Sequence, residues 1–411
     1  MNTMLLAVSG MSPAIITETL YGMNKRGDAW PRSIKIITTA IGADKIWQGL
    51  VEQHQLEKLC DELDKPHIEI TREDILVVPN AAGEPVVDAR SRDDHEALAN
   101  FITSTVRDFT QDEHTAIHAS LAGGRKTMTF YLGYAMTLFG RHFDRLSHVL
   151  ISEGFEGHPE FYFPTRESRL IQNQEGDTLD TKDAQVTLAD IPFVRQRQLV
   201  PDMLTEFEET VNFRQLVDLI NLGEDTGQIR ITVNSQEQTL RLTSPAYPGI
   251  DMEVAFSSPW SWILYLLIID ESLLTPSEGR GEFIRPQKVA DSVLAGMMAR
   301  KFAEIHGLEL AGETSLEILG ELKEHQLLDD NPTLERTLEA VLDKEGVTGS
   351  QFDTYLQQLQ KALQRILPTN LVSALMPTQL YSEDGTVLET KGKKKGYGIP
   401  LPNPQRQITI T

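Results

Sequence analysis

The chain has 411 residues, of which 40% are hydrophobic, and this length predicts two globular domains. Its formal net charge of −22 disfavours a protein that coats DNA or RNA, because phosphate neutralisation dominates such binding, but a small anionic ligand in a local basic pocket is compatible with it. A single cysteine excludes an internal disulfide framework, and no zinc-site spacing is present. The apolar runs are shorter than a membrane span and the start has no basic segment, so we expect a cytoplasmic protein without a signal peptide.

Strands and helices alternate in the first part of the chain. Short apolar or β-branched runs predict strands, and the longer segments between them have helical periodicity. The expected strands are 4–8, 33–39, 75–79, 115–119 and 146–151, and the expected helices begin near residues 13, 43, 93 and 128. This alternation is typical of βαβ units, so we predict an α/β fold, a parallel sheet flanked by helices, for a first domain at 1–165.

The first expected strand leads into a turn that can face a ligand. Residues 9–11 read Ser-Gly-Met, and Ser12 and Pro13 are typical of the cap and the first position of a helix. Ligands bind at the carboxyl ends of strands in such sheets, where a glycine lets them approach the backbone. Thr38 and Thr39 end the neighbouring strand, where they either line the same pocket or pack in the core.

The most informative segment is HASLAGGRKT at 118–127, which joins a strand to a helix. Its adjacent glycines, Gly123 and Gly124, let backbone N–H groups approach an anion near the positive end of the helix. Arg125 and Lys126 add full positive charges. The spacing is not that of a P-loop, so an ordinary tight turn between strand and helix is the alternative. In a doubly wound sheet this turn and the first one can lie side by side.

The rest of the chain contains a connector and a second domain. Residues 166–205 are rich in Asp, Gln and Thr, and we interpret them as a connector with a small hairpin. The second domain, 206–411, is mainly helical, with helices expected at 206–222, 259–269, 286–305, 316–326 and 352–367. Strands are expected at 228–234, 238–242, 386–389, 397–401 and 407–410. This order loosely resembles a winged helix but lacks a basic recognition helix, so a scaffold or dimerisation domain is the alternative.

The two turns, in LAVSGMSPA at 6–14 and SLAGGRK at 120–126, together resemble the CARF domain of CRISPR-associated proteins, in the family called CRISPR ring nucleases. The resemblance covers about residues 1–165 and, more loosely, residues 191–195 and the C-terminal half. It implies a Rossmann-like domain that forms a homodimer and binds cyclic oligoadenylate, the second messenger of type III CRISPR antiviral defence, with a functional link to the type III effector complex. Some members also cut the ring. A twofold dimer matches the symmetry of four adenylates, so we expect cyclic tetra-adenylate.

The resemblance also implies a catalytic pair. Lys126 would contact a phosphate and stabilise its charge, and Ser9 would position the ribose or the scissile phosphate. The residues expected to bind the ligand are Gly10, Met11, Ser12, Thr39, Ser120, Gly123, Gly124 and Arg125. Ring opening needs no metal or cofactor, because the ribose 2′-OH attacks the adjacent phosphorus in line and leaves a 2′,3′-cyclic phosphate. The alternatives are that Ser9 satisfies its own turn, Ser12 caps its helix, Arg125 is structural and His118 is a core histidine.

Two further functions stay open for the second domain. Arg300 and His306 match the loose spacing of a HEPN ribonuclease motif, which chance also produces, and both lie near the end of an expected helix, where the dipole favours cations. Otherwise the chain is a ligand-gated regulator without enzyme activity, whose second domain binds DNA or a protein. The lysine-rich stretch 391–395 favours DNA, and the acidic total charge disfavours it.

Overall fold

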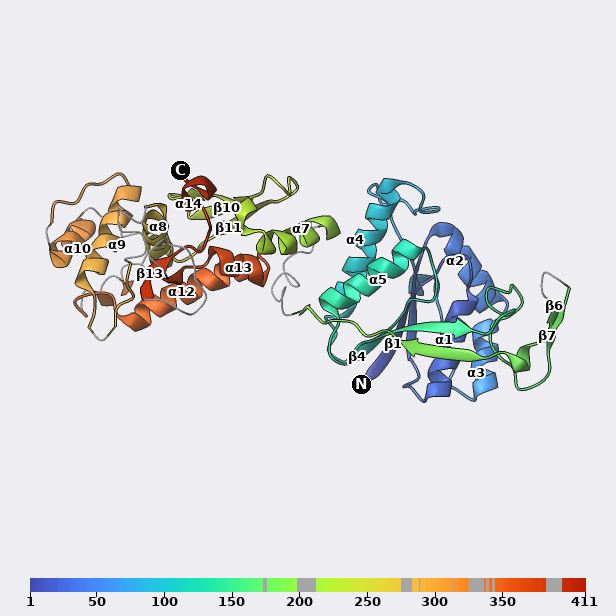
Figure 1. The fold of residues 1–411 in the computed structure, drawn as a ribbon. Coiled ribbons are helices and arrows are strands. Elements are labelled where there is room, and N and C mark those ends of the chain that lie inside the picture. The colour runs from blue at the N-terminus through green and yellow to red at the C-terminus, as the bar shows by residue number, and fades with distance from the viewer. Residues whose placement is uncertain are drawn as a thin grey trace. The chain divides into compact units, whose positions relative to one another are not determined.

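The structure is a computed structural model that describes residues 1–172, 176–197, 212–274, 283–287, 289–312, 314–324, 336–337, 340–341, 344–381 and 394–411. The chain divides into two compact units, Met1–Gln198 and Leu199–Thr411 (Figure 1). Each unit has its own sheet and its own buried apolar residues.

A six-stranded sheet forms the centre of the N-terminal unit, with the strand order β3-β2-β1-β4-β5-β8. Its strands are β1 (Asn2–Val8), β2 (Ser33–Thr38), β3 (Ile75–Val77), β4 (Thr115–Ser120), β5 (Arg145–Ile151) and β8 (Val186–Asp190). The first five are parallel, and β8 pairs antiparallel with β5. Because parallel strands end at the same edge, the turns after β1, β2, β3 and β4 all begin at one edge of the sheet.

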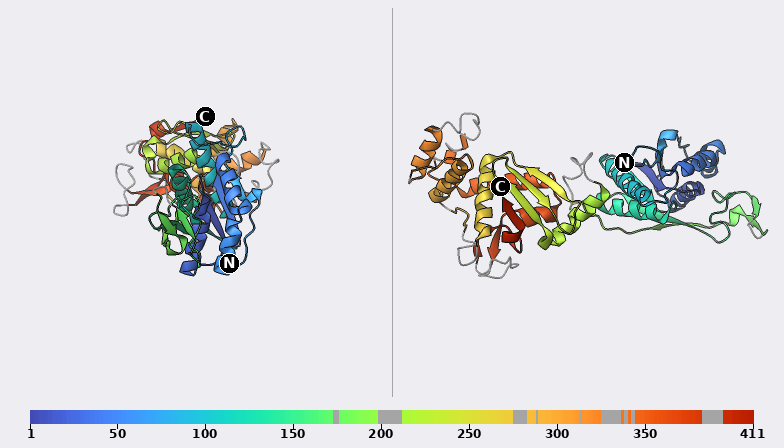
Figure 2. Two further views of the ribbon diagram at one scale, coloured as in Figure 1. Left: turned by 90° about the vertical axis from the view of Figure 1, so that its right-hand side faces the viewer. Right: turned by 90° about the horizontal axis from the view of Figure 1, so that it is seen from above.

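Helices cover both faces of this sheet (Figures 1 and 2). The helices are α1 (Ala14–Arg26), α2 (Ala40–Ile46), α3 (Gln55–Leu63), α4 (Arg92–Phe109) and α5 (Lys126–Phe139), and a π-helical segment, Trp47–Glu52, continues α2. Leu5 and Ala7 of β1 pack with the apolar side chains of α1, α2 and α3. The alternate residues Leu6 and Val8 are also fully buried, and they face the side where α4 and α5 pack together. The predicted α/β fold with a mostly parallel sheet is therefore confirmed.

The stretch 166–205 contributes more structure than a connector. β6 (Leu170–Gln172) and β7 (Thr178–Asp180) form the expected hairpin, which projects from the sheet in Figure 1. Ile171 and Ala184 pack with Phe155 and Phe161 in a small core of their own. β8 then completes the main sheet, so the sheet continues past the predicted domain end at residue 165 to Asp190.

The C-terminal unit combines helices with small sheets. Its helices are α7 (Phe213–Glu224), α8 (Pro259–Leu273), α9 (Ser292–Ile305), α10 (Ser315–Glu324), α12 (Gly349–Gln364), α13 (Thr369–Leu375) and α14 (Pro404–Gln407). One sheet has the order β11 (Asp251–Ala255), β10 (Thr239–Thr243), β9 (Arg230–Asn234), β14 (Ile408–Ile410), and a hairpin joins β12 (Thr378–Tyr381) to β13 (Lys394–Gly398).

This arrangement confirms the prediction of a helical C-terminal region with small hairpins. The apolar run predicted as a helix is α8, which is buried on nearly every side and carries the fully buried Trp262 and Tyr265. The strand expected at 386–389 lies outside the described residues, and the likeness to a winged helix stays a prediction. Within the described ranges, no helix combines the length and the apolarity needed to cross a membrane.

Candidate ligand-binding site

Three turns meet at the carboxyl edge of the N-terminal sheet, those after β1, β2 and β4. A Cβ placed on Gly10 would lie 3.4 Å from the Cα of Gly124, so the turns after β1 and β4 are in van der Waals contact. A Cβ placed on Gly42 would lie 2.7 Å from the carbonyl oxygen of Gly10, so the start of α2 packs against the same turn. These turns lie side by side, as expected for the ends of adjacent parallel strands.

Both positions of the Gly-Gly turn after β4 favour glycine, Gly123 because of crowding and Gly124 because of its backbone conformation. A Cβ on Gly123 would lie 2.3 Å from the Cδ1 of Ile15, and Gly124 has a φ of +83°, in the left-handed region that favours glycine. In the part of the chain that the structure describes, the N–H groups of Gly10, Gly123 and Gly124 donate to no backbone carbonyl. They are available to an anion at the positive end of α5.

Lys126 and Arg125 play different roles at this turn. Lys126 is the first residue of α5, is exposed, and has no ion-pair or hydrogen-bond partner among the described residues. Arg125 is engaged: its Nε donates to Oδ1 of Asp88 at 3.0 Å, and its Nη2 donates to the same oxygen. Of the two predicted cations, Lys126 is therefore the one that can turn its whole charge toward a ligand.

Two of the three serines predicted to reach the ligand, Ser9 and Ser120, are fully buried. The Oγ of Ser9 donates to the carbonyl oxygen of Ser12 at 3.1 Å, which is the alternative that the sequence left open. The Oγ of Ser120 lies 3.1 Å from Oγ1 of Thr19 in α1, because Ser120 is in register with Ala7 and shares its face of the sheet. Both hydroxyls hold the turns in shape from within.

The other predicted contacts differ in their access to solvent. Pro13 occupies the cap position of α1 and no side chain caps the helix, so the prediction of Ser12 as the cap is wrong. Ser12 is instead half-buried in the turn. Met11 is 60% exposed beside it, whereas Thr39, at the cap position of α2, is 8% exposed and makes no side-chain cap hydrogen bond. Met11 and Ser12 therefore form the surface of the first turn, and Thr39 lies beneath the surface.

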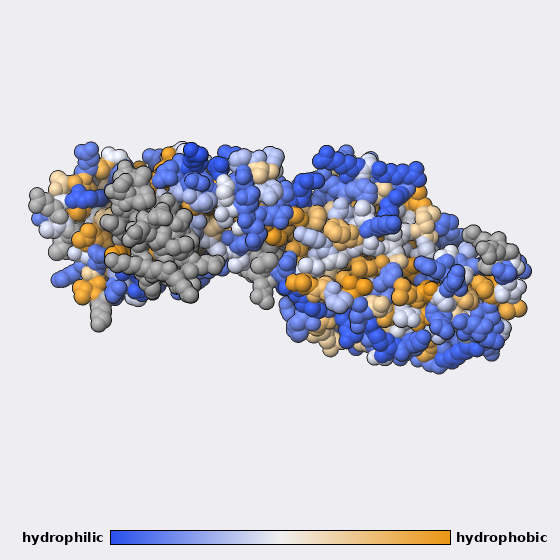
Figure 3. All heavy atoms as spheres, in the orientation of Figure 1, coloured by the Kyte–Doolittle hydropathy of each residue, from blue (hydrophilic) through white to orange (hydrophobic). Residues whose placement is uncertain are grey.

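Sequence reasoning missed the segment between β3 and α4. Asp88 in this segment binds both Arg125 and Arg90, whose Nε lies 2.8 Å from Oδ2 of Asp88. These hydrogen bonds, Arg125 first and then Arg90, lower the pKa of Asp88, so the carboxylate stays ionised. Figure 3 shows hydrophilic residues along the upper margin of this unit, over α4. The sequence feature that could have drawn attention to this segment is the Arg-Ser-Arg triplet at 90–92, at the start of an expected helix.

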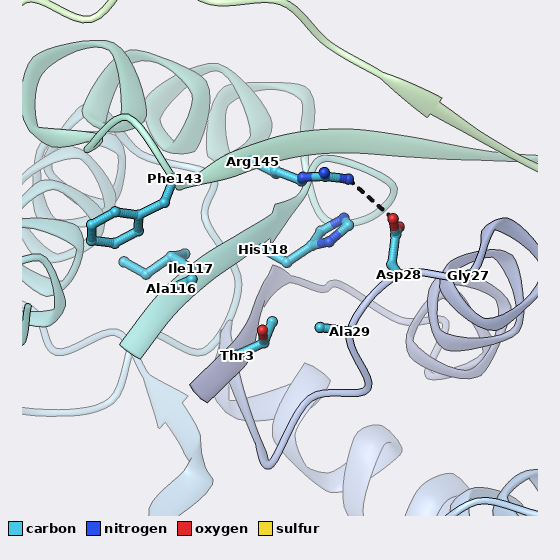
Figure 4. Close-up of a pocket in the computed structure, with 9 residues that line it drawn as sticks. All are labelled: Thr3, Gly27, Asp28, Ala29, Ala116, Ile117, His118, Phe143 and Arg145. Atoms are coloured by element: carbon cyan, nitrogen blue, oxygen red, sulfur yellow. Dashed lines mark hydrogen bonds and ion pairs between the residues drawn. The ribbon is translucent and has the colours of Figure 1, made fainter. Parts of the chain in front are cut away.

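His118 is a core histidine, the alternative favoured by its place inside a strand. It is 3% exposed, its Nε2 lies 2.7 Å from Oγ of Ser147, and burial lowers its pKa to about 4. A cavity of about 220 Å³ beside it opens at the other edge of the sheet, where β1, β4 and β5 begin (Figure 4). Its charged residues Asp28 and Arg145 are paired with each other at 3.0 Å. This cavity is separate from the turns that carry the predicted ligand residues.

Both residues of the ribonuclease alternative form hydrogen bonds with backbone carbonyls near the end of α9. Arg300 donates to the carbonyl oxygens of Leu310 and Gly312 in the following turn. Nδ1 of His306 pairs with the carbonyl oxygen of Phe302 at 2.8 Å, and its ring lies 4.4 Å from the Phe302 ring. The lysines at 391–393 lie outside the described residues, and the described side chains include no cluster of three metal-ligating groups.

Comparison with protein-family models relates the chain to a known family. A search of the curated proteins finds no match to the chain. The model of the family described as CRISPR-associated protein NE0113 (Cas_NE0113) matches residues 12–221. This match begins at Ser12 in the first turn, includes the whole Gly-Gly turn and spans more than half of the chain. The chain therefore belongs to the CRISPR-associated protein family Cas_NE0113.

Proposed function

We propose that this protein binds cyclic oligoadenylate at the carboxyl edge of its N-terminal sheet, as a CARF domain serving a type III CRISPR system. The supporting observation is the cradle formed by the interlocked turns: open N–H groups of Gly123 and Gly124 lie at the positive end of α5, next to the unpaired Lys126. A phosphodiester anion has the charge that such a cradle attracts. The CRISPR-associated family adds independent support.

We further propose that the bound ring is opened, which makes the protein a ring nuclease. The ribose 2′-oxygen attacks the adjacent phosphorus, the bond from phosphorus to the 5′-oxygen breaks, and the proton of the 2′-OH passes through solvent to the departing 5′-oxygen. The products are a linear strand with a 2′,3′-cyclic phosphate and a 5′-hydroxyl. Lys126 and the N–H groups stabilise the charge on the phosphoryl oxygens, and the rigid turns hold the in-line geometry.

The geometry changes the role of the predicted serine. Ser9 is buried and donates to the carbonyl oxygen of Ser12, so in this proposal it fixes the shape of the turn. The Ser12 side chain is half-buried at the same turn, and we propose that its hydroxyl contacts the ribose. A homodimer with twofold symmetry would set two such cradles around one ring, and cyclic tetra-adenylate fits that symmetry.

The test is product analysis after incubation with cyclic tetra-adenylate in the presence of EDTA. Wild-type protein should yield linear products with a 2′,3′-cyclic phosphate, and Lys126→Ala should slow their formation at least about a hundredfold, the loss typical of removing one charge-stabilising donor. Lys58→Ala is the matched control, because Lys58 is an exposed lysine on α3 that donates to the carbonyl oxygen of Gln53. It should keep wild-type activity.

Other results would redirect the proposal. Tight binding with an intact ring would leave the N-terminal unit a sensor and favour a ligand-gated regulator whose C-terminal unit binds DNA or protein. Failure to bind any ring size would overturn the CARF proposal. The ribonuclease alternative has no contact in its favour, because Arg300 and His306 both bind nearby backbone carbonyls of their own unit. If a His306→Ala variant cleaved RNA as well as wild type does, the ribonuclease alternative would be ruled out.

A further inference from the structure

The chain between β3 and α4, residues 78–91, forms a strap over the carboxyl edge of the sheet. Its first part is held to β2 and α2: Val78 N donates to the carbonyl oxygen of Thr38 at 3.0 Å, and Ala40 N donates to that of Val86 at 2.9 Å. Its last part reaches Arg125 in the turn after β4 through Asp88. Because β2 and β1 lie between β3 and β4, the strap and the Arg125 side chain together bridge the ends of these two strands.

Asp88 is the point where the strap meets the proposed phosphate site. Its Oδ1 accepts two hydrogen bonds from Arg125, through Nε and Nη2, and its Oδ2 accepts one from Arg90. The side chain of Arg125 is 43% exposed and that of Arg90 is 83% exposed, so both cations stay open to a ligand. One carboxylate thus orients two arginines at the rim of the Gly-Gly turn.

The backbone of the strap around Asp88 is firmly held. Ser91 caps α4, and its Oγ accepts a hydrogen bond from Asp94 N at 3.0 Å. The Oδ2 of Asp94 in turn accepts from the N–H groups of Arg90 and Ser91 at 3.1 and 2.9 Å. Val86 and Ala89 on either side of Asp88 are 3% and 1% exposed. The position of the Asp88 carboxylate is therefore set before any ligand arrives.

We propose that Asp88 is a positioning residue of the ligand site and acts through Arg125. This inference rests on the proposed function. Asp88 engages the Nε edge of the guanidinium and leaves its Nη1 group, which has no partner among the described residues, to donate to a phosphodiester beside Lys126. Without Asp88 the long Arg125 side chain loses its fixed orientation and must be ordered by the ligand itself.

The direction in which Asp88→Ala changes the Kd distinguishes a positioning role for Asp88 from a simple effect of its charge. Asp88→Ala removes a negative charge beside a site for an anion, so electrostatics alone predicts tighter binding. Positioning predicts weaker binding, and we expect the Kd for cyclic tetra-adenylate, measured by isothermal titration calorimetry, to rise about tenfold. Asp93→Ala is the matched control, because it removes an equal charge from the exposed first turn of α4 and should bind at least as tightly as wild type.

A double-mutant cycle tests whether the effect passes through Arg125. In an Arg125→Ala background no positioning effect is left, so Asp88→Ala should leave the Kd unchanged or lower it through the lost negative charge, whereas a general structural role would weaken binding in both backgrounds. Asp88→Glu should recover part of the affinity. The positioning role would be overturned if Asp88→Ala bound the ring as tightly as wild type or more tightly, or if it weakened binding equally in both backgrounds. Either result would leave the proposed function standing. A wild-type protein that binds no ring would overturn both.

Discussion

Glu18 is a buried carboxyl group in the middle of α1, and it is 5% exposed. The adjacent Thr17 donates through Oγ1 to the carbonyl oxygen of Tyr162 at 2.7 Å, so the segment around Tyr162 covers this side of the helix. Burial, and secondly the charge of Glu156, raise the pKa of Glu18 to about 8. At neutral pH the folded protein therefore holds a proton at Glu18 that the unfolded chain would release.

This proton makes stability depend on pH in a defined direction. The folded pKa of Glu18 lies above its ordinary value of 4.5, so its contribution to the free energy of unfolding is complete below about pH 4.5 and is lost as the pH rises toward about 8. We expect Glu18→Gln to gain stability relative to wild type by on the order of 3 kcal/mol between pH 5 and pH 8. Urea unfolding at several pH values measures this difference.

The control for this experiment is Glu153→Gln, which changes an exposed glutamate in the segment that follows β5. It should leave the pH dependence of the wild type unchanged. Parallel stability curves for wild type and Glu18→Gln would contradict the raised pKa of Glu18.

At the residue scale, the sequence predicted the two turns that lie side by side at the sheet edge, but not how deeply each of their side chains is buried. Lys126 follows two glycines and begins a helix, and these local features are enough to predict an exposed cation near an anion cradle. Ser120 looks equally available in the sequence. Its partner Thr19 lies 101 residues away, and only the register of β1 with β4 shows that the two hydroxyls face each other inside the unit.

At the scale of elements, the site depends on how closely the turns pack. A Cβ on Gly10 would lie 3.4 Å from the Cα of Gly124, so the turns after β1 and β4 pack at van der Waals distance. Gly123 lies against Ile15 in the first turn of α1, so α1 and the Gly-Gly turn fix each other's position. Changes in this packing should alter the ligand cradle and the stability of the unit together.

Gly123→Ala tests this coupling. The new Cβ would lie 2.3 Å from Cδ1 of Ile15 and 3.0 Å from the carbonyl oxygen of Val8, so either the buried Ile15 side chain or the turn must shift. We expect a loss of about 1–3 kcal/mol in the free energy of unfolding, the usual cost of overpacking, together with weaker ligand binding. Guanidinium unfolding and ligand titration measure the two effects.

Gly133→Ala supplies the matched comparison in the same region. Gly133 lies inside α5, and its nearest neighbours would be 3.9 and 4.0 Å from the new Cβ, an ordinary contact. Alanine is the better helix former by up to about 1 kcal/mol, so this variant should be as stable as wild type or more stable. Equal stability of the two alanine variants would show that the turn yields easily.

Among the elements, those with strong local periodicity were the predictable ones. The parallel strands and the helices between them follow from alternating apolar runs, and the order of these elements gave the fold class. β8 was not predicted as a strand because its sequence, Val-Thr-Leu-Ala-Asp, is short and lies among polar residues. Its pairing with β5 is a tertiary contact that a local pattern does not record. The contact between the strap and the Gly-Gly turn was not predicted for the same reason, since Asp88 and Arg125 are 37 residues apart.

At the scale of the whole molecule, the two units have separate sheets and separate helices. The N-terminal unit encloses its own apolar core around Leu5, Ile16 and Ile36, all fully buried. The C-terminal unit buries Trp262, Tyr265 and Phe352. A domain with its own core can fold as a cooperative unit.

We therefore expect residues 1–197, expressed alone, to fold and unfold cooperatively. The fragment should show near-ultraviolet circular dichroism from Trp30 and Trp47, and a single thermal transition that coincides by far- and near-ultraviolet signals. Full-length protein should show a second transition for the other unit. A fragment with secondary structure but no cooperative transition would mean that residues beyond 197 are required for packing the first core.

The position of β14 has a consequence for synthesis of the protein. β14 pairs in parallel with β9, and Thr411 N donates to the carbonyl oxygen of Val233, 178 residues earlier, at 2.8 Å. On the ribosome, one edge of β9 therefore stays uncovered until the segment around residue 410 has left the exit tunnel. An uncovered strand edge invites pairing with other chains. Nascent or truncated chains that lack β14 should thus be the ones that chaperones retain and that form inclusion bodies.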